Sequence, residues 1–232
     1  MDFAFNEEQQ ELRSTARSFL SERCGPEQVR HAMESELGYD PELWSQIEEE
    51  LGWSAITIPE RFGGLGLGYV ELVALLEETG AALLCAPFFS SVCMAANALL
   101  AAGSEAQKQE YLPGIAEGRT LAALACTGSE GRWDLSGIDV HSRRDGGDVR
   151  LAGSARFVLD RQGAEVLIVA ARREGTVDPE GIALFAVPAA TRGVSLTGVP
   201  TMDQTRRLAE IDLSDVRVPA ANQLGDEGQG GA

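Results

Sequence analysis

The sequence predicts an α+β protein, with an all-helical part followed by an antiparallel β part. Before Gly118, apolar residues recur at the spacing of helices; after it, short apolar runs alternate with turn residues. Helices grouped before strands are typical of α+β folds. We therefore expect an N-terminal helical domain over residues 1–118, a middle β domain forming a barrel or sandwich over 119–225, and the start of a linker over 226–232.

Capping residues predict where several helices of the first part begin. Two pairs match the capping box, in which each side chain bonds the other residue's backbone: Asn6 with Gln9, and Ser104 with Gln107. Asp40 before Pro41 suits the N-cap and first position of another helix. Further helices are expected from Val70 to Gly80 and from Pro87 to Leu100, and the last helix should end near Pro113.

Apolar runs in the second part predict strands. They are Leu121–Cys126, Val149–Leu151, Arg156–Leu159, Val166–Ala171, Ile182–Val187 and Ile211–Val218. The segment Asp145-Gly146-Gly147-Asp148 is a hairpin signal, because Asp and Gly tolerate the positive φ angles of tight hairpin turns. The pattern favours an antiparallel barrel or a pair of packed sheets.

Charge limits the classes of partner. The chain has 36 acidic and 19 basic side chains, for a net charge of −17. Nucleic acids and anionic membrane surfaces both require a surplus of Lys and Arg, so neither is an expected partner. No apolar run approaches the ~20 residues of a membrane span, and the first ten residues lack the pattern of a signal peptide. We expect a cytoplasmic protein without membrane insertion.

The cysteines and histidines do not predict a metal site. The four cysteines form no closely spaced pair, and the two histidines lie in unrelated segments. Cys85, Cys93 and Cys126 have apolar neighbours, so we interpret them as small buried hydrophobes in a reducing compartment.

Several segments resemble motifs of one enzyme family. They are Phe5–Leu12, the loop Ile58–Gly68, the segment Gly103–Pro113, and Val216–Pro219 followed by Leu224–Gly230. These segments are similar to motifs of acyl-CoA dehydrogenases. Phe5–Leu12 resembles the family's first helix, and Ile58–Gly68 resembles its P-E-x-[YF]-G-G-x-G loop. Gly103–Pro113 resembles the G-[ST]-E-x-Q-K-x-x-[YW]-L-P segment, and the last two segments together resemble the V-R-V-P…L-G-x-x-G-x-G run. Arg156–Asp160 and Met202–Leu208 resemble a divergent branch common in actinobacteria.

The resemblance implies FAD-dependent α,β-dehydrogenation of an acyl-CoA thioester, in fatty acid or steroid side-chain β-oxidation. Its implied partners are the acyl-CoA substrate, an electron-transfer flavoprotein or similar acceptor, and like or paralogous subunits in a homotetramer or heterotetramer. In the family, the catalytic carboxylate comes from a C-terminal four-helix domain that this sequence does not include. We therefore assign no catalytic residue, expect the isolated chain to be inactive and to hold FAD weakly, and interpret Glu60, Glu77 and Glu78 as solvated charges.

One implied wall of the flavin site is the segment Thr127–Asp134, which aligns with the family's T-E-P-x-x-G-S-D. Thr127 and Asp134 match, and Leu124 and Cys126 lie beside Thr127. The family's serine at the cofactor diphosphate is replaced, and Arg132 would supply charge there instead. Trp133 is bulky enough to obstruct the same place.

The second implied wall is Phe157-Val158-Leu159, which takes the place of the family's W-I-T turn. Phe157 keeps an aromatic face for the flavin ring, whereas Leu159 lacks the hydroxyl that the family places near N5. A backbone N–H would then have to donate the hydrogen bond to flavin N5, and the redox potential of the flavin would differ from that in the family.

Two other functions stay open. The chain can be a non-catalytic partner subunit of a heteromeric acyl-CoA dehydrogenase, because both implied walls depart from the common pattern. It can also belong to a flavin monooxygenase or a nitroalkane-oxidase-like enzyme on the same scaffold, since a fold alone does not fix the chemistry.

Overall fold

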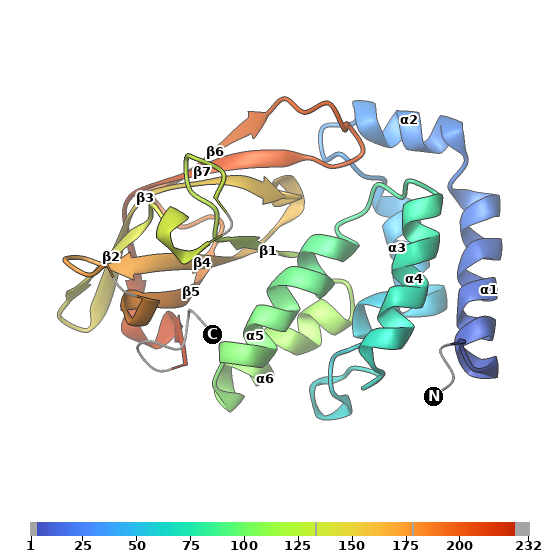
Figure 1. Ribbon diagram of the computed structural model, residues 1–232, viewed down its shortest axis with the longest axis horizontal. Coiled ribbons are helices and arrows are strands. Elements are labelled where there is room, and N and C mark those ends of the chain that lie inside the picture. The colour runs from blue at the N-terminus through green and yellow to red at the C-terminus, as the bar shows by residue number, and fades with distance from the viewer. Residues whose placement is uncertain (1–3, 133, 178, 226–232) are drawn as a thin grey trace.

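The computed structural model describes residues 4–132, 134–177 and 179–225. Helices come first and strands follow, so the predicted α+β class is confirmed. The main helices are α1 (Glu7–Arg23), α2 (Pro26–Glu34), α3 (Pro41–Leu51), α4 (Tyr69–Ala81), the π-helix η3 (Phe89–Ala96) that runs into α5 (Asn97–Ala102), and α6 (Glu105–Ala116). Figure 1 shows α5 and α6 between the sheet and the other helices.

The predicted helix starts are confirmed. Both capping boxes are formed, and the Asp40 carboxylate accepts the backbone N–H of Glu42 at 2.9 Å. Two helices extend beyond their predicted ends, because α4 passes Gly80 and α6 passes Pro113. The buried side chains of Leu112 and Ile115 on either side of Pro113 explain the second case, since packing outweighs the hydrogen bond that proline lacks.

In the described residues, eight strands form one mostly antiparallel sheet. They are β1 (Ala122–Ala125), β2 (His141–Asp145), β3 (Asp148–Leu159), β4 (Val166–Arg173), β5 (Ile182–Pro188), β6 (Val194–Val199), β7 (Leu208–Pro219) and β8 (Gln223–Leu224). The order is β6-β7-β3-β2-β4-β5-β8, with β1 attached to β4. The hairpin predicted at Asp145–Asp148 joins β2 to β3.

Strand β4 has parallel neighbours, which the antiparallel prediction did not include. Its first half pairs with β1, from Val166 to Val169, and its end pairs with β2, at Arg172 and Arg173. The chain therefore leaves the sheet after β1 and rejoins the same edge of β4 at β2. The intervening loop, residues 126–140, carries the first implied wall of the flavin site.

One apolar cluster joins the helices to the sheet. Ile58, Leu99 and Leu112 from the helical part pack with Ile168 of β4 and Leu224 of β8, and all are fully buried. This packing joins the helices to β4 and β8, and the hydrogen bonds between Ser91 of η3 and the backbone of Ala122 fix the position of β1 and of the loop after it.

The structure corrects the interpretation of Glu78 as a solvated charge. Its side chain is only 5% exposed, and its carboxylate accepts hydrogen bonds from Arg13 and Arg17 of α1. These bonds, chiefly those from Arg17, lower the pKa of Glu78 to about 2. Glu78 thus ties α4 to α1 and has no proton to exchange near neutral pH.

Among the helices of the described residues, none is both long and apolar enough to cross a membrane.

Candidate flavin-facing site

The two implied walls lie directly beside each other. The backbone carbonyl of Thr127, just after β1, accepts the N–H of Arg156 in β3 at 2.7 Å. This bond joins segments about thirty positions apart in the chain, and it fixes the loop after β1 against the end of β3.

A β-bulge turns Phe157 out of the sheet. Between Ala155 and Val158, β3 has two residues where β7 has one, Glu210. Phe157 has φ of 56°, in the left-handed region that is unfavourable for a bulky residue. Such a conformation persists only when the surroundings enforce it, and it is common at functional sites. Here the neighbouring Arg156 is held by an ion pair with Glu210 at 2.9 Å.

The bulge leaves the aromatic ring of Phe157 partly exposed to solvent. Phe157 is 38% exposed. A Cβ atom at Gly131 would come within 3.0 Å of the ring's Cε2 atom, so the backbone of the loop lies against one edge of Phe157. Gly131 also has φ of 67°, so a side chain there would be strained as well as crowded.

The other residues of the implied walls differ in what they can offer. Thr127 is buried beside Cys126, and burial raises the pKa of the Cys126 thiol. The side chain of Val158 is buried in the sheet core, so only its backbone can face a ligand. Leu124 packs its side chain into the cluster that joins the helices to the sheet.

Arg132 is already paired, which the sequence did not indicate. Its guanidinium donates to Asp134 at 2.7 Å, and Asp134 also accepts the backbone N–H of Ser136 at 2.9 Å. The Ser136 hydroxyl and Arg132 together lower the pKa of Asp134 to about 2. A diphosphate at this place would have to compete with Asp134 for Arg132. Trp133, the remaining residue of this wall, lies outside the described residues.

Leu159 faces an apolar pocket at the junction with the helices. The pocket, of about 360 Å³, is lined by Leu84, Phe88 and Phe89 from the helical part and by Arg206 from the β part. Arg206 donates to the backbone carbonyl of Leu84 at 2.8 Å and so closes one side of it.

Asp160 is a polar residue of this junction that the sequence reasoning did not single out. Its backbone is left-handed, with φ of 50°, and its N–H donates to the carbonyl of Arg207 at 2.9 Å. Burial raises the pKa of Asp160 to about 6, although the Ser90 hydroxyl and the charge of Arg206 act in the opposite direction. The sequence signal that could have indicated Asp160 is its position, because it is a polar residue directly after the turn that carries Phe157.

Within the described part of the chain, no three His, Cys, Asp or Glu side chains group closely enough to hold a metal ion. The four cysteines are free. The arrangement at the site is therefore an aromatic face, a buried threonine and backbone polar groups, which suit an organic ring better than a cation.

Comparison with known proteins identifies the family. Residues 6–119 match the model of the acyl-CoA dehydrogenase N-terminal domain. The mitochondrial isovaleryl-CoA dehydrogenase of Pongo abelii is 32% identical over 243 aligned residues, which cover 97% of this chain and 54% of that protein. The chain thus spans about half the length of the curated relatives it matches.

Solved structures agree over the whole chain. Butyryl-CoA dehydrogenase from Megasphaera elsdenii superposes with a TM-score of 0.86 at 28% identity, covering 100% of this chain and 62% of that one. The ChsE4-ChsE5 complex from Mycobacterium tuberculosis gives a TM-score of 0.87 at 28% identity, covering 99% of this chain and 60% of the matched one. The chain therefore belongs to the acyl-CoA dehydrogenase family.

Proposed function

We propose that this chain forms the flavin-facing part of an FAD-dependent acyl-CoA dehydrogenase, with domain boundaries near residues 118 and 225. The observation that supports it most is the bulge that sets Phe157 beside the loop after Thr127. A partly exposed aromatic ring beside the backbone of this loop is a surface on which a flat ring system can pack, which is worth ~1 kcal/mol beyond the area buried.

The residues present fit a flavin ring in part. Phe157 would pack against its face, the Thr127 hydroxyl and nearby backbone would meet its polar edge, and the backbone of Leu159 would take the place of the missing hydroxyl. FAD, when bound, would supply the acceptor for a hydride from the substrate β-carbon. Removal of the α-proton is not assigned to Glu78, because hydrogen bonds from Arg17 and Arg13 lower its pKa to about 2 and make it too weak a base.

The proposal includes partners and location. The substrate would be an acyl-CoA thioester, the electron acceptor an electron-transfer flavoprotein or similar protein, and the assembly a tetramer of like or paralogous subunits. Four free cysteines favour the reducing cytoplasm.

A flavin titration followed by amide NMR tests this function, since NMR detects the weak binding expected of the chain alone. With millimolar FAD, we expect the amide signals of Thr127, Gly131 and Phe157 to shift. Phe157→Ala should remove these shifts, whereas Leu196→Ala, an equally exposed apolar residue on β6, should keep them. Shifts confined to other surfaces would contradict the proposal.

A second function, a non-catalytic partner subunit, is favoured by the pairing of Arg132 with Asp134 and by the absent hydroxyl at Leu159. The similarity to one chain of a two-component complex supports it as well. If the chain is such a subunit, the titration should leave Thr127 and Phe157 unmoved, and FAD should co-purify only with a paralogous partner.

A further inference from the structure

The first wall of the flavin-facing site follows a strand, β1, whose two edges differ. One edge pairs with β4, and on this side the Leu121 carbonyl just before the strand accepts the N–H of Glu165 at 2.8 Å. Backbone groups of successive strand residues point to opposite edges, so Ala122 and Leu124 direct theirs away from β4. No strand in the described part of the chain pairs with this second edge, which leads to Thr127. Another element must therefore hold it.

A serine of the π-helix η3 holds this second edge of β1. The Ser91 hydroxyl accepts the N–H of Ala122 at 2.7 Å and donates to the Ala122 carbonyl at 3.2 Å. Both residues are only 1% exposed, so water has little access to replace the hydroxyl. Loss of the hydroxyl would leave two buried backbone groups without partners, which costs more than the loss of an exposed hydrogen bond. Ser91 thus does for Ala122 what a neighbouring strand does elsewhere in the sheet.

The geometry of η3 turns two consecutive serines toward the β part. A π-helix has more residues per turn than an α-helix, so neighbouring side chains are separated by a smaller angle. Ser90, also 1% exposed, donates to the Pro87 carbonyl at 3.1 Å. The same hydroxyl lies beside the carboxyl of Asp160, directly after the turn that carries Phe157. The next residue of η3, Val92, packs among the helices instead.

We propose that η3 holds both walls of the flavin-facing site in place, with Ser91 positioning Thr127 through β1 and Ser90 positioning Phe157 through Asp160. Both serines are positioning residues, because neither belongs to a wall itself. Short π-helical segments are rare and occur frequently at functional sites, which agrees with this role. The purpose of the arrangement rests on the proposed function, but the positions of the two walls can be measured without FAD.

Hydrogen exchange of the Arg156 amide tests the role of Ser91 in the chain without FAD. This amide donates to the Thr127 carbonyl at 2.7 Å, so its protection reports the position of the first wall. Ser91→Ala should speed its exchange by about tenfold or more relative to the amides in the middle of β4, because both backbone groups of Ala122 lose their partner. Ser91→Cys, whose thiol forms weaker hydrogen bonds, should give a smaller increase and replaces the alanine variant if that variant fails to fold.

Hydrogen exchange of the Asp160 amide tests the role of Ser90 in the same way. This amide donates to the Arg207 carbonyl at 2.9 Å, so its protection reports the turn of the second wall. Ser90→Ala should speed exchange of the Asp160 amide relative to the amides of β4, and it should leave the Arg156 amide unchanged. The two serine variants should therefore loosen different walls.

The ionisation of Asp160 provides a readout that packing alone would not change. The Ser90 hydroxyl lowers the pKa of Asp160 against the effect of burial, so Ser90→Ala should raise that pKa above its value of about 6. Arg206 and the thiol of Cys85, which also face this carboxyl, are the same in both proteins. Carbon-13 NMR of the carboxyl group during a pH titration measures the shift.

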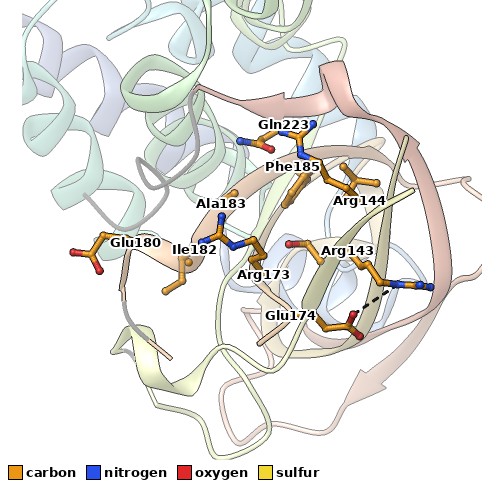
Figure 2. A pocket seen from close by; sticks show the side chains of 12 residues that line it. Arg143, Arg144, Arg173, Glu174, Glu180, Ile182, Ala183, Phe185 and Gln223 are labelled. Atoms are coloured by element: carbon orange, nitrogen blue, oxygen red, sulfur yellow. Dashed lines mark ion pairs between the residues drawn. The ribbon is translucent and has the colours of Figure 1, made fainter. Parts of the chain in front are cut away.

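Two controls separate positioning from general loosening. Val92→Ala removes buried volume from η3 on its helical side, and Val149→Ala removes it from the start of β3. Val149 lines the pocket of about 460 Å³ shown in Figure 2, and it precedes Phe157 by eight residues, or about 26 Å at ~3.3 Å per residue. Both variants should be less stable than the wild type, but neither should speed the Arg156 or Asp160 amide relative to the amides of β4.

The outcomes distinguish this proposal from the flavin-facing function. Val92→Ala loosening both amides as much as the serine variants do, or an unchanged pKa of Asp160 in Ser90→Ala, would overturn the positioning role. The flavin-facing function fails instead if FAD leaves the wild-type Thr127 and Phe157 signals unmoved, whatever the exchange rates are. If FAD does shift them, Ser91→Ala should reduce the shift of Thr127, and Val92→Ala should keep it.

Discussion

Two carboxyl groups, Glu48 and Asp160, lie in surroundings that favour their protonated forms. Burial raises the pKa of Glu48 to about 7, against the hydrogen bonds that it accepts from Ser54, and it raises the pKa of Asp160 to about 6. One oxygen of each, Glu48 Oε1 and Asp160 Oδ2, is buried without a hydrogen-bond partner. Each carboxylate therefore destabilises the fold once it is ionised.

Glu48→Gln should raise stability at high pH only. The folded pKa is above the ordinary 4.5, so the protonated group contributes stability fully below pH 4.5 and loses it as pH rises to about 7. Above that pH, the variant should be more stable than the wild type by up to roughly 3 kcal/mol. Urea unfolding across this range measures the difference.

The exposed neighbour Glu49 provides the control for this experiment, and Glu49→Gln should show no such pH-dependent gap. A Glu48→Gln advantage that is equal at pH 4.5 and at high pH would show that ionisation is not its cause. Asp160→Asn should likewise become more stable than the wild type as pH rises, over the narrower pH range from 3.8 to about 6.

At the candidate site, the sequence could predict residue types but not their partners. The family resemblance implies that Thr127 and Phe157 belong to the two walls, and the structure puts their segments in contact. The bulge at Phe157 could not be foreseen, because it depends on pairing with Glu210 across the sheet. The same holds for Arg132, whose pairing with Asp134 follows from the fold of its loop.

At the scale of elements, α1 and α4 are joined by a shared carboxylate. Glu78→Gln should lower the free energy of unfolding at neutral pH by about 1–3 kcal/mol, because it weakens charge-assisted hydrogen bonds from Arg13 and Arg17. Glu77→Gln is the control, since its pair with Arg13 is about half exposed and worth less than ~1 kcal/mol.

The effect of Glu78→Gln should depend on pH with the opposite sign to that of Glu48→Gln. The folded pKa of Glu78 lies below the ordinary 4.5, so its stabilisation is present above pH 4.5 and is lost as pH falls to about 2. Thermal melts at neutral and acidic pH report this loss. Equal destabilisation by the Glu77 and Glu78 variants would refute the central role of Glu78.

Elements with strong local signals were predictable, and those defined by distant contacts were not. Asn6, Asp40 and Ser104 marked true helix starts. The sequence pattern does not indicate helix α2, because that helix buries little more than Val29 and Ala32. Apolar runs do not indicate strands β2 and β6, because both strands are mostly exposed. Strand β3 shows two separate runs in the sequence, because its bulges interrupt the alternation of apolar and polar residues.

At the scale of the molecule, the helices and the sheet share a core. Gln107 of α6 donates to the backbone carbonyls of Ala221 and Gln223 at 2.8 and 2.7 Å, and Ser91 of η3 exchanges hydrogen bonds with the backbone of Ala122 in β1. Because of these bonds and the joint apolar cluster, neither part can unfold alone without exposing apolar surface of the other part.

The shared core predicts that a defect deep in the sheet destabilises the helices. Ile211 of β7 is fully buried in a cluster made only of residues from the β part. Ile211→Ala should cost about 2–5 kcal/mol. In a Trp133→Phe background, the remaining tryptophans, Trp44 and Trp53, lie buried among helices and report on that part alone.

If the two parts unfold as one unit, Ile211→Ala should lower the denaturant midpoint of tryptophan fluorescence as much as that of far-UV circular dichroism. Ile168→Ala, within the joint cluster, should do the same. Independent parts would instead leave the fluorescence midpoint of Ile211→Ala at its wild-type value while the dichroism transition splits in two. One transition would mean that the position of Thr127 beside Phe157 is maintained by the whole molecule, because the helices that hold β1 could not loosen without the sheet.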